Sequence, residues 1–408
     1  MAHQKVLVFI LAGGKGERLF PLTSFRSKPS VPFGGRYRIV DFVLSNCVNS
    51  GLYSIYLLVQ YKSQSLIEHV RQYWSFASIV KDHFVAVVPP QMKMGPEWFQ
   101  GTADAIFQNI NLIKDHKADL VVIFGADHIY RMDIRQMIDF HLKNDAAVTV
   151  AARPVPIEQA SAFGVIVADN EKRITGFQEK PKAPTPMPGD PKRAYVSMGN
   201  YVFRTDVLIG ALVKAQKKRE HDFGAHIIPS LVETGKVFAY DFATNIIPGT
   251  KPYEEKGYWR DVGTIQAYFD AHVDLLGEKP AFDVHNSQWP IHPQGYTGPA
   301  TKILGGRIKN SLIAEGSIIK NAKISNSIIQ SGVIIENGVE IDECIIMDGV
   351  TINKGCKLRR VIIDKHNVLS DCDQIGFEPD KDRFRCHIDQ GSGIAIIPRS
   401  GRMKPVIK

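Results

Sequence analysis

The sequence has little that would place it in a membrane or cross-link it covalently. It contains no run of 18 apolar residues and no amino-terminal signal peptide, so we expect a soluble, cytoplasmic protein without membrane contacts. Only five of its 408 residues are cysteine, and they show neither Cys-x-x-Cys pairs nor the spacing of zinc ligands. We therefore expect free thiols, most of them buried as small apolar side chains.

Motifs for binding nucleic acid are also absent. The net charge is +8, from 50 basic and 42 acidic residues, and such an excess fits nucleic acid, a membrane surface or small anionic ligands. The basic residues are scattered along the chain. This distribution favours anionic metabolites as ligands and no nucleic acid, with most of the excess charge forming an ordinary solvated surface.

Two common phosphate-binding motifs are missing, although glycines gather near the amino terminus. Residues 5–10 form a short apolar run typical of a buried parallel strand. Residues 11–23 follow as Leu-Ala-Gly-Gly-Lys-Gly-Glu-Arg-Leu-Phe-Pro-Leu-Thr, which is not a P-loop. Leu19 stands where the dinucleotide fingerprint needs a third glycine. The loop nevertheless lies where ligands bind in open α/β sheets.

This glycine-rich loop has the composition of an anion site. Gly13, Gly14 and Gly16 let backbone N–H groups approach a phosphate. Arg18 and Lys28 add cations that could hold a polyphosphate. A flexible turn is the alternative for three glycines alone, but the two cations favour a nucleoside triphosphate site.

Strand and helix patterns alternate through the amino-terminal half of the chain. Such alternation predicts a parallel sheet with helices on both faces. The strands are predicted at residues 55–59, 84–88, 120–124 and 147–151, and the helices at residues 38–49, 63–74, 103–114 and 134–143.

Two carboxylates stand where a metal ion could bind. Asp127 follows the strand predicted at residues 120–124, which puts it on the same edge of the sheet as the glycine-rich loop. A carboxylate there would repel bound phosphates unless it held Mg²⁺, whereas a plain turn residue is the alternative. Asp261 precedes a helix predicted at residues 265–276, so it is either a second metal ligand or part of a helix-terminal turn.

Two further segments have both a structural and a functional interpretation. Residues 98–104, Trp-Phe-Gln-Gly-Thr-Ala-Asp, are readable as helix capping by Thr102 or Asp104 or as a ligand loop. Lys180 follows a hairpin predicted at residues 164–177, and a lysine beside a turn proline is commonly just a solvated surface residue.

The last quarter of the chain changes to a period of five or six residues. This hexapeptide repeat predicts a left-handed parallel β-helix, which usually packs against other subunits or a first domain. We expect a first domain at residues 1–280, a linker at 281–301 and the β-helix at 302–408. The repeating aliphatic positions are Ile313, Ile319, Ile324, Ile329, Ile335, Ile341, Ile346, Ile352, Leu358 and Ile363.

Together these motifs resemble those of the bacterial ADP-glucose pyrophosphorylase family, over nearly the whole chain. The resemblance implies an α/β fold: a Rossmann-like nucleotidyltransferase domain with a mostly parallel sheet, followed by a left-handed parallel β-helix. It also implies a reaction of ATP with α-D-glucose 1-phosphate that gives ADP-glucose and diphosphate and supplies glycogen synthesis. The motifs begin at Leu11, Trp98, Gly125, Glu179, Ser197 and Tyr258.

The resemblance also implies individual roles. Arg18, Lys28 and Asp127 would be catalytic: the two cations hold the triphosphate and the leaving diphosphate, and Asp127 binds Mg²⁺ together with Asp261. Phe99 stands where many members have tyrosine, so a hydroxyl contact is missing. The other substrate contacts would be Leu11, Gly13, Gly14, Gln91 and Gly101 for the nucleotide, and Gly164, Glu179, Lys180 and Ser197 for glucose 1-phosphate, with Asp261 beside them.

Members of this family are usually homotetramers regulated by anionic metabolites. Phe25 and Pro32 stand where members activated by fructose 1,6-bisphosphate have a basic residue and a histidine. Residues 379–408 contain seven Lys or Arg against three Asp. We therefore expect an anionic effector, but not strong activation by fructose 1,6-bisphosphate. The candidate effector residues are Arg36, Arg38, Arg383 and Arg385.

Three other functions fit parts of the pattern. Another sugar-1-phosphate nucleotidyltransferase, using UTP, dTTP or GTP, would share the same phosphate and metal residues. A catalytically silent regulatory subunit would lose the cations and carboxylates that this chain has, such as Lys28 and Asp127. A nucleic-acid-binding relative with the same two-domain plan is supported only by the positive charge and would need salt-sensitive binding to RNA or DNA.

Overall fold

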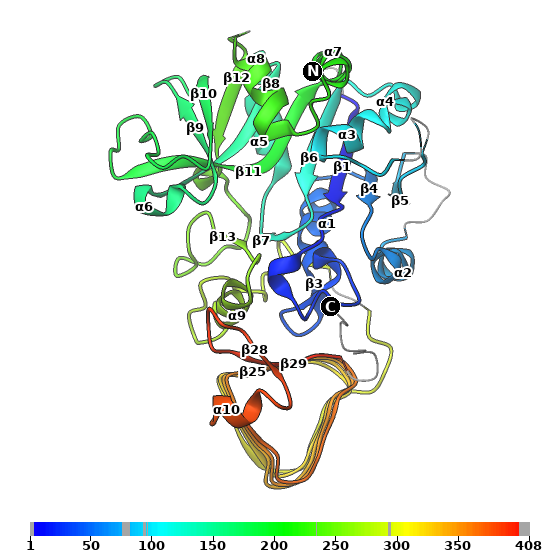
Figure 1. Cartoon of the computed structure of the whole chain (residues 1–408), viewed down its shortest axis with the longest axis vertical. Coiled ribbons are helices and arrows are strands. Elements are labelled where there is room, and N and C mark those ends of the chain that lie inside the picture. Colours follow the sequence, from blue (N-terminus) through cyan, green and yellow to red (C-terminus); the bar gives the residue numbers. More distant parts are fainter. Residues whose placement is uncertain are drawn as a thin grey trace.

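A computed structural model describes residues 4–75, 82–92, 95, 97–233, 235–292 and 295–399. Its amino-terminal part is built on a nine-stranded mixed sheet (Figure 1). Four strands form the parallel half in the order β6 (Leu120–Gly125), β1 (Val6–Ala12), β4 (Ser54–Val59) and β5 (Phe84–Val88). The alternating pattern of the sequence predicted these strands correctly.

The other half of the sheet is mostly antiparallel. The long strand β11 (Arg193–Arg204) runs antiparallel to β6 and also pairs with β8 (Val148–Pro156) and β9 (Gly164–Ala168). The remaining strands are β10 (Ile174–Glu179), which forms the expected hairpin with β9, and β12 (Val237–Asp241), which runs parallel to β8. The strand predicted at residues 147–151 therefore exists, but it joins the sheet through β11 instead of continuing the parallel order.

Helices cover both faces of this sheet (Figure 1). Strand β1 is apolar throughout because both of its faces are buried. Val8 and Ile10 belong to the buried cluster on one face of the sheet, and Leu7 and Phe9 belong to the cluster on the other face. The helices of this part of the chain are α1 (Ile39–Asn49), α2 (Gln64–Tyr73), α3 (Thr102–Phe107), α4 (Ile110–His116), α5 (Ile134–Lys143), α6 (Ile157–Ala160), α7 (Thr205–Lys218) and α8 (Ile228–Val232). A further helix, α9 (Ile265–Val273), lies away from the sheet and packs towards the β-helix (Figure 1).

The prediction of one continuous helix over residues 103–114 is wrong. The structure has two short helices, α3 and α4, which are interrupted at Asn109. Asn109 has φ −112° and ψ 19°, and its buried side-chain amide donates a hydrogen bond to the Ala105 carbonyl at 2.8 Å. A short polar side chain that bonds to nearby backbone competes with the helix ladder, which accounts for the break.

The carboxy-terminal repeat forms a parallel β-helix with three stacks of short strands, seen end-on as a triangle in Figure 1. Ile318 pairs with Ile334 and Ile334 pairs with Thr351, so one coil takes 16 or 17 residues. Nine of the ten predicted positions are buried, and Ile313 in the first coil is half-buried. The predicted β-helix is confirmed. The first stack consists of β14 (Lys302–Ile303), β17 (Ile318–Ile319), β20 (Ile334–Ile335), β23 (Thr351–Ile352) and β26 (Val368–Leu369). The second consists of β15 (Gly306–Lys309), β18 (Ala322–Ser325), β21 (Glu340–Asp342), β24 (Lys357–Arg359) and β27 (Gln374–Ile375). The third consists of β16 (Leu312–Ile313), β19 (Ile328–Ile329), β22 (Ile345–Ile346), β25 (Val361–Ile363) and β29 (Ala395–Ile397), with β28 (His387–Ile388) paired to β29.

The stack that contains β19, β22 and β25 packs against the first domain. Ile328, Ile345 and Ile362 share one buried cluster with Phe33 and Tyr268. Within the segment expected to be a linker, four side chains are buried as well, so the described part of this segment is packed rather than extended into solvent: Phe282, Asn286, Trp289 and Ile291. The domain boundaries remain a prediction. Residues 400–408 of the predicted second domain lie outside the described residues.

Two further predictions concern the cysteines and membrane-spanning helices. All five cysteines are free, and four of them are buried. Among the described residues, no helix combines the length and apolar character needed to cross a bilayer.

One buried histidine in this interior gives a prediction for stability against pH. The His272 ring donates through Nδ1 to the Tyr268 carbonyl at 2.8 Å and accepts the Gly34 N–H through Nε2 at 3.2 Å. Burial lowers the pKa of His272 to about 4, against an ordinary value of 6.5. The unfolded ring therefore takes up a proton below pH 6.5 while the folded ring stays neutral, so the free energy of unfolding falls from pH 6.5 to pH 4.

We expect this ring to contribute up to about 1.4 kcal/mol of lost stability per pH unit in that window. The measurement is chemical denaturation at a series of pH values, for the wild type and His272→Gln. The variant should be less stable at pH 7 but lose stability less steeply towards pH 4. His285→Gln, at an exposed side chain, is the control, and an unchanged slope in His272→Gln would contradict the prediction.

Candidate active site

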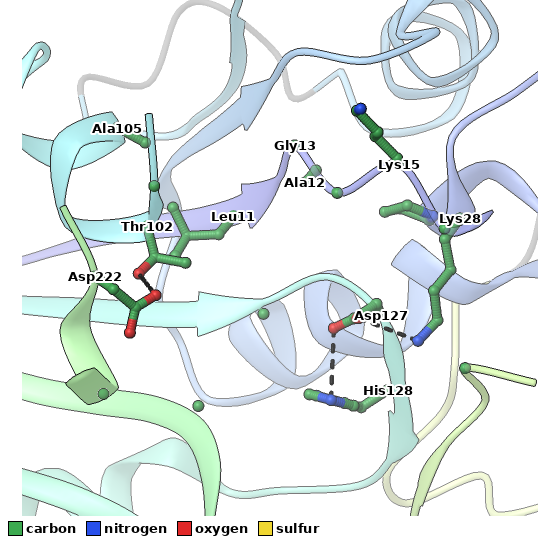
Figure 2. Close-up of a pocket in the computed structure, with 18 of the residues that line it drawn as sticks. Leu11, Ala12, Gly13, Lys15, Lys28, Thr102, Ala105, Asp127, His128 and Asp222 are labelled. Carbon is green, nitrogen blue, oxygen red and sulfur yellow. Dashed lines mark hydrogen bonds and ion pairs between the residues drawn. The ribbon is translucent and has the colours of Figure 1, made fainter. Parts of the chain in front are cut away.

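A cavity of about 950 Å³ opens at the carboxyl ends of the parallel strands (Figure 2). Residues at and after the end of β1 line one side of it, and Gly125, Asp127 and His128, from the end of β6 to the start of the next strand, line the adjacent side. The antiparallel half of the sheet contributes Glu179 and Ser197. The cavity therefore lies where the sequence pattern predicted a ligand site.

Most of the predicted site residues meet in this cavity. Asp261 does not line it, but it contacts Lys28, which does. Gln91 and Lys180 are exceptions: Gln91 is exposed and donates a hydrogen bond to the Pro89 carbonyl, and Lys180 is exposed and pairs with Glu179 at 3.2 Å. The predicted residues that line the cavity are Leu11, Gly13, Gly14, Arg18, Lys28, Phe99, Gly101, Asp127, Gly164, Glu179 and Ser197.

Lys28 is the central cation of the site. Its Nζ lies 3.1 Å from Asp127 Oδ2 and 2.8 Å from Asp261 Oδ1, and its side chain is only 8% exposed. Burial works against the charged ammonium, yet the two carboxylates together raise the pKa of Lys28 above its ordinary value. The lysine is therefore held as a cation between two anions.

The glycine-rich loop makes room for this lysine. Gly16 has φ +65°, and a side chain there would place its Cβ 3.0 Å from the Cβ of Lys28. The Thr23 hydroxyl donates to the Gly16 carbonyl at 2.9 Å and closes the loop. Only glycine combines this left-handed conformation with so close an approach.

A two-stranded antiparallel ladder brings the second carboxylate into place. In it, β13 (Trp259–Asp261) pairs with β7 (His128–Tyr130), and Asp261 is directly opposite His128. A Cβ on Gly263 would lie 2.9 Å from Arg18 Nη2 and 3.0 Å from Asp261 Oδ1. The guanidinium group of Arg18 and the Asp261 carboxylate therefore converge on the same glycine.

Three of these side chains could hold a divalent cation. Asp127, His128 and Asp261 each offer one ligand atom, and those atoms lie within 4.8 Å of one another. Burial disfavours the charged form of Asp127, but the neighbouring His128 and Lys28 outweigh it, so the pKa of Asp127 lies well below its ordinary value. An ionised Asp127 carboxylate, with the Asp261 carboxylate close by, fits a hard divalent cation.

Comparison with known proteins agrees with this geometry. The nucleotidyl transferase family matches residues 7–278, and a GlmU-like carboxy-terminal hexapeptide family matches residues 299–397. A glucose-1-phosphate adenylyltransferase from Thermodesulfovibrio yellowstonii is 68% identical over 99% of this chain and 98% of its own. The chain belongs to the glucose-1-phosphate adenylyltransferase family. Relatives of the same name from Anaeromyxobacter sp. and Corynebacterium jeikeium are 47% and 44% identical, over 98% and 97% of this chain and 100% and 98% of their own.

Membership in this adenylyltransferase family makes the chain a nucleotidyltransferase, and enzymes of this class generally use a divalent metal. Both parts of the fold predicted from the resemblance are thereby confirmed. The roles of individual residues are not decided by membership, and they remain predictions.

The loop at residues 98–104 has a clearer structural role than the sequence showed. The N–H groups of Ala103 and Asp104, at the start of α3, donate to the His221 carbonyl at 2.8 and 3.3 Å. A Cβ on Gly101 would lie 2.3 Å from the same oxygen. The helix terminus is therefore occupied by this chain's own backbone, while Phe99 and Gly101 still line the cavity.

Sequence analysis missed several residues that line the cavity of this adenylyltransferase. The Gln60 side chain accepts the Phe99 N–H at 2.8 Å and fixes the 98–104 loop. The Thr102 hydroxyl donates to the Asp222 carboxylate at 3.0 Å, on the side of the cavity across from Lys28 (Figure 2). No spacing rule singled out Gln60 or Asp222, because each reaches the cavity from a segment far from the recognised motifs. Among the lining residues with polar side chains, Gln60 and Asp222 lie outside every recognised motif, whereas Lys15, Glu17, Thr102, His128 and Tyr201 lie in recognised motifs but were assigned no substrate contact.

The four predicted effector residues are each engaged within the chain. Arg36 pairs with Glu315 at 2.9 Å, and Arg38 donates to the Ser65 carbonyl at 2.8 Å. The other two follow the short helix α10 (Pro379–Asp382), where Arg383 pairs with Asp380 and Arg385 pairs with Asp373. Binding of an effector to these residues remains a prediction.

Proposed function

We propose that this protein transfers the adenylyl group of ATP to α-D-glucose 1-phosphate, which gives ADP-glucose for glycogen synthesis and releases diphosphate. One observation carries the proposal. The glycine-rich loop, Arg18, Lys28 and Asp127 line one cavity, and Asp261 contacts Lys28, in a chain whose relatives are named glucose-1-phosphate adenylyltransferase. A phosphate oxygen of the sugar phosphate attacks the α-phosphorus of ATP in line. The bond from that phosphorus to the β-phosphate oxygen breaks, so no covalent enzyme intermediate is needed.

In this proposal the enzyme works by placing two anions in line and neutralising the charge that develops between them. The backbone of Gly13 and Gly14 approaches the triphosphate, and Arg18 and Lys28 hold the β- and γ-phosphates as the diphosphate leaves. Lys28 is preorganised for this by the two carboxylates that keep it charged.

Asp127 and Asp261 would hold Mg²⁺. When bound, Mg²⁺ would neutralise phosphate charge that the two cations leave uncompensated. The two carboxylates also share Lys28, so their separation is set by protein contacts before any substrate arrives.

The sugar phosphate would occupy the side of the cavity formed by β9, β10 and β11. Glu179 is suited to accept hydrogen bonds from sugar hydroxyls, and Ser197 and the backbone of Gly164 complete the pocket. A Cβ on Gly164 would lie 2.5 Å from the Phe177 ring, so this wall is backbone pressed against an aromatic side chain. Lys180 is exposed and pairs with Glu179, and this neighbourhood supports a contact of its ammonium group with the sugar's phosphate.

Lys180→Ala should raise the KM for glucose 1-phosphate about 10- to 100-fold, because one charge-assisted phosphate contact contributes roughly 1.5–3 kcal/mol. The expected change in kcat is smaller. Initial rates at saturating ATP test this, with Lys182→Ala in the same exposed loop as the control. An unchanged KM for the sugar phosphate would remove Lys180 from the phosphate contact.

The nucleotide is tested by diphosphate release with Mg²⁺ and glucose 1-phosphate, comparing ATP, UTP, dTTP and GTP in parallel. Preference for ATP supports the adenylyltransferase. Preference for another nucleotide would keep the fold and mechanism and replace the substrate. No release with any of the four would favour a catalytically silent subunit.

We also propose that the enzyme acts in the cytoplasm as a homotetramer under the control of an anionic metabolite. The β-helix supports the assembly, because solenoid faces commonly pack between subunits. A panel of sugar phosphates, inorganic phosphate and AMP tests the regulation, with Arg36, Arg38, Arg383 and Arg385 as the residues to vary. A flat rate across the panel would refute it.

A further inference from the structure

His128 is a polar side chain of the cavity wall that the proposed mechanism does not use. Its side chain is 14% exposed. Within the described part of the chain, Nδ1 is buried without a hydrogen-bond partner, and Nε2 makes only a 3.5 Å ion-pair contact with Asp127 Oδ1 (Figure 2). Buried polar atoms are nearly always satisfied, so two under-used ring nitrogens point to a ligand that is absent from the structure.

The fold directs this ring towards the metal-binding carboxylates. His128 follows Asp127 in sequence and lies opposite Asp261 in the β7–β13 ladder. Residues directly opposite each other in an antiparallel ladder project from the same face, about 5 Å apart. On its other side the ring packs against Trp259, with centroids 4.7 Å apart.

The charge of the site favours a neutral ligand at this position. Lys28 already contacts both carboxylates, and a further cation would add to its repulsion of a metal ion, whereas a third carboxylate would repel the phosphates. A neutral imidazole supplies a donor atom without either cost. Imidazole nitrogen is a good ligand for transition-metal dications, whereas Mg²⁺ strongly prefers oxygen.

We propose that His128 is a nitrogen ligand of the divalent cation in this site and thereby raises its affinity for Mn²⁺ and Co²⁺ relative to Mg²⁺. This inference rests on the metal site of the proposed function, and it adds a third protein ligand to the two carboxylates.

The decisive experiment is pulsed electron paramagnetic resonance on Mn²⁺ bound to the intact protein, without nucleotide or sugar phosphate. We expect echo modulation from a directly bound ¹⁴N nucleus, replaced by a ¹⁵N signal when the protein is made with ¹⁵N-histidine. Isotope exchange needs no mutation, so it does not depend on a variant folding. His128→Asn should abolish the nitrogen signal, and the exposed His285→Asn should retain it.

Affinity gives a second measurement on the same proteins. His128→Asn should raise the Kd for Mn²⁺ about tenfold or more, measured from the paramagnetic resonance signal of free Mn²⁺. The Kd for Mg²⁺, measured by its competition with Mn²⁺, should rise much less. Absence of a nitrogen signal from the wild type, or its persistence in His128→Asn, would overturn the proposal. An unchanged Mn²⁺ to Mg²⁺ ratio in the variant would do the same.

These readouts separate this inference from the proposed function. A wild-type protein that releases diphosphate from ATP with Mg²⁺ but shows no nitrogen signal would retain its function and lose the histidine ligand. A protein with the nitrogen signal that releases no diphosphate would retain the ligand and lose the function.

Discussion

Asp127→Asn should lower kcat about 100- to 1,000-fold, the usual effect of removing one preorganised electrostatic contact from an active site. The carboxylate contacts Lys28 and belongs to the cluster that would hold the metal. The amide of asparagine keeps the shape of the side chain but loses the negative charge that would attract Lys28 and the metal ion. The KM values for ATP and glucose 1-phosphate should change less, because the loss falls mainly on the transition state.

Diphosphate release at saturating substrates and Mg²⁺ measures this effect. Asp115→Asn, at an exposed carboxylate of α4, is the control and should have the kcat of the wild type. Because Asp127 is also a partner of Lys28, a thermal melt of each variant separates lost chemistry from lost folding. A folded Asp127→Asn protein with near-normal kcat would remove Asp127 from the metal site.

Asp364→Asn should lower the free energy of unfolding by about 3–5 kcal/mol, because it leaves a buried guanidinium without its counterion. Arg26 and Asp364 pair between the segment after the glycine-rich loop and the β-helix, and their side chains are 5% and 2% exposed. The same segment leads directly to Lys28. Chemical denaturation should therefore show a lower midpoint. The kcat should also fall, because the segment that positions Lys28 loses its buried ion pair.

The exposed Asp371→Asn in the neighbouring coil is the matched control. The double variant Arg26→Met with Asp364→Leu should recover much of the loss, since replacing a whole buried pair by apolar side chains is far less costly than removing one partner. Wild-type stability of Asp364→Asn would mean that this ion pair does not hold the two domains together.

Local sequence was sufficient wherever one element carried the signal. The apolar run before Leu11 predicted the central strand, and the strand before Asp127 predicted which edge of the sheet the carboxylate would reach, because consecutive parallel strands end on one side. The ten aliphatic positions of the repeat predicted the β-helix, since each coil must bury the same position.

Local sequence failed where a neighbour in space decided the outcome. The break at Asn109 depends on a side-chain bond to Ala105 that competes with the helix ladder. The strand over residues 147–151 was recognised, but its place beside β11 was not, because the pattern of one strand does not specify its partner. Gln91 and Lys180 were assigned by resemblance to the family, and in this structure they lie outside the cavity wall, so their roles stay predictions.

The sequence by itself determined the two-domain plan, the edge of the sheet where the cavity lies, and eleven of the residues that line this cavity. These follow from periodicity and motif, which act over a few residues. Only the tertiary structure decided that Lys28 joins Asp127 to Asp261, that β13 places Asp261 opposite His128, and that Arg26 is neutralised by Asp364 in the β-helix. Those contacts join residues 99 to 338 positions apart, a separation over which only packing of the whole chain selects the partner.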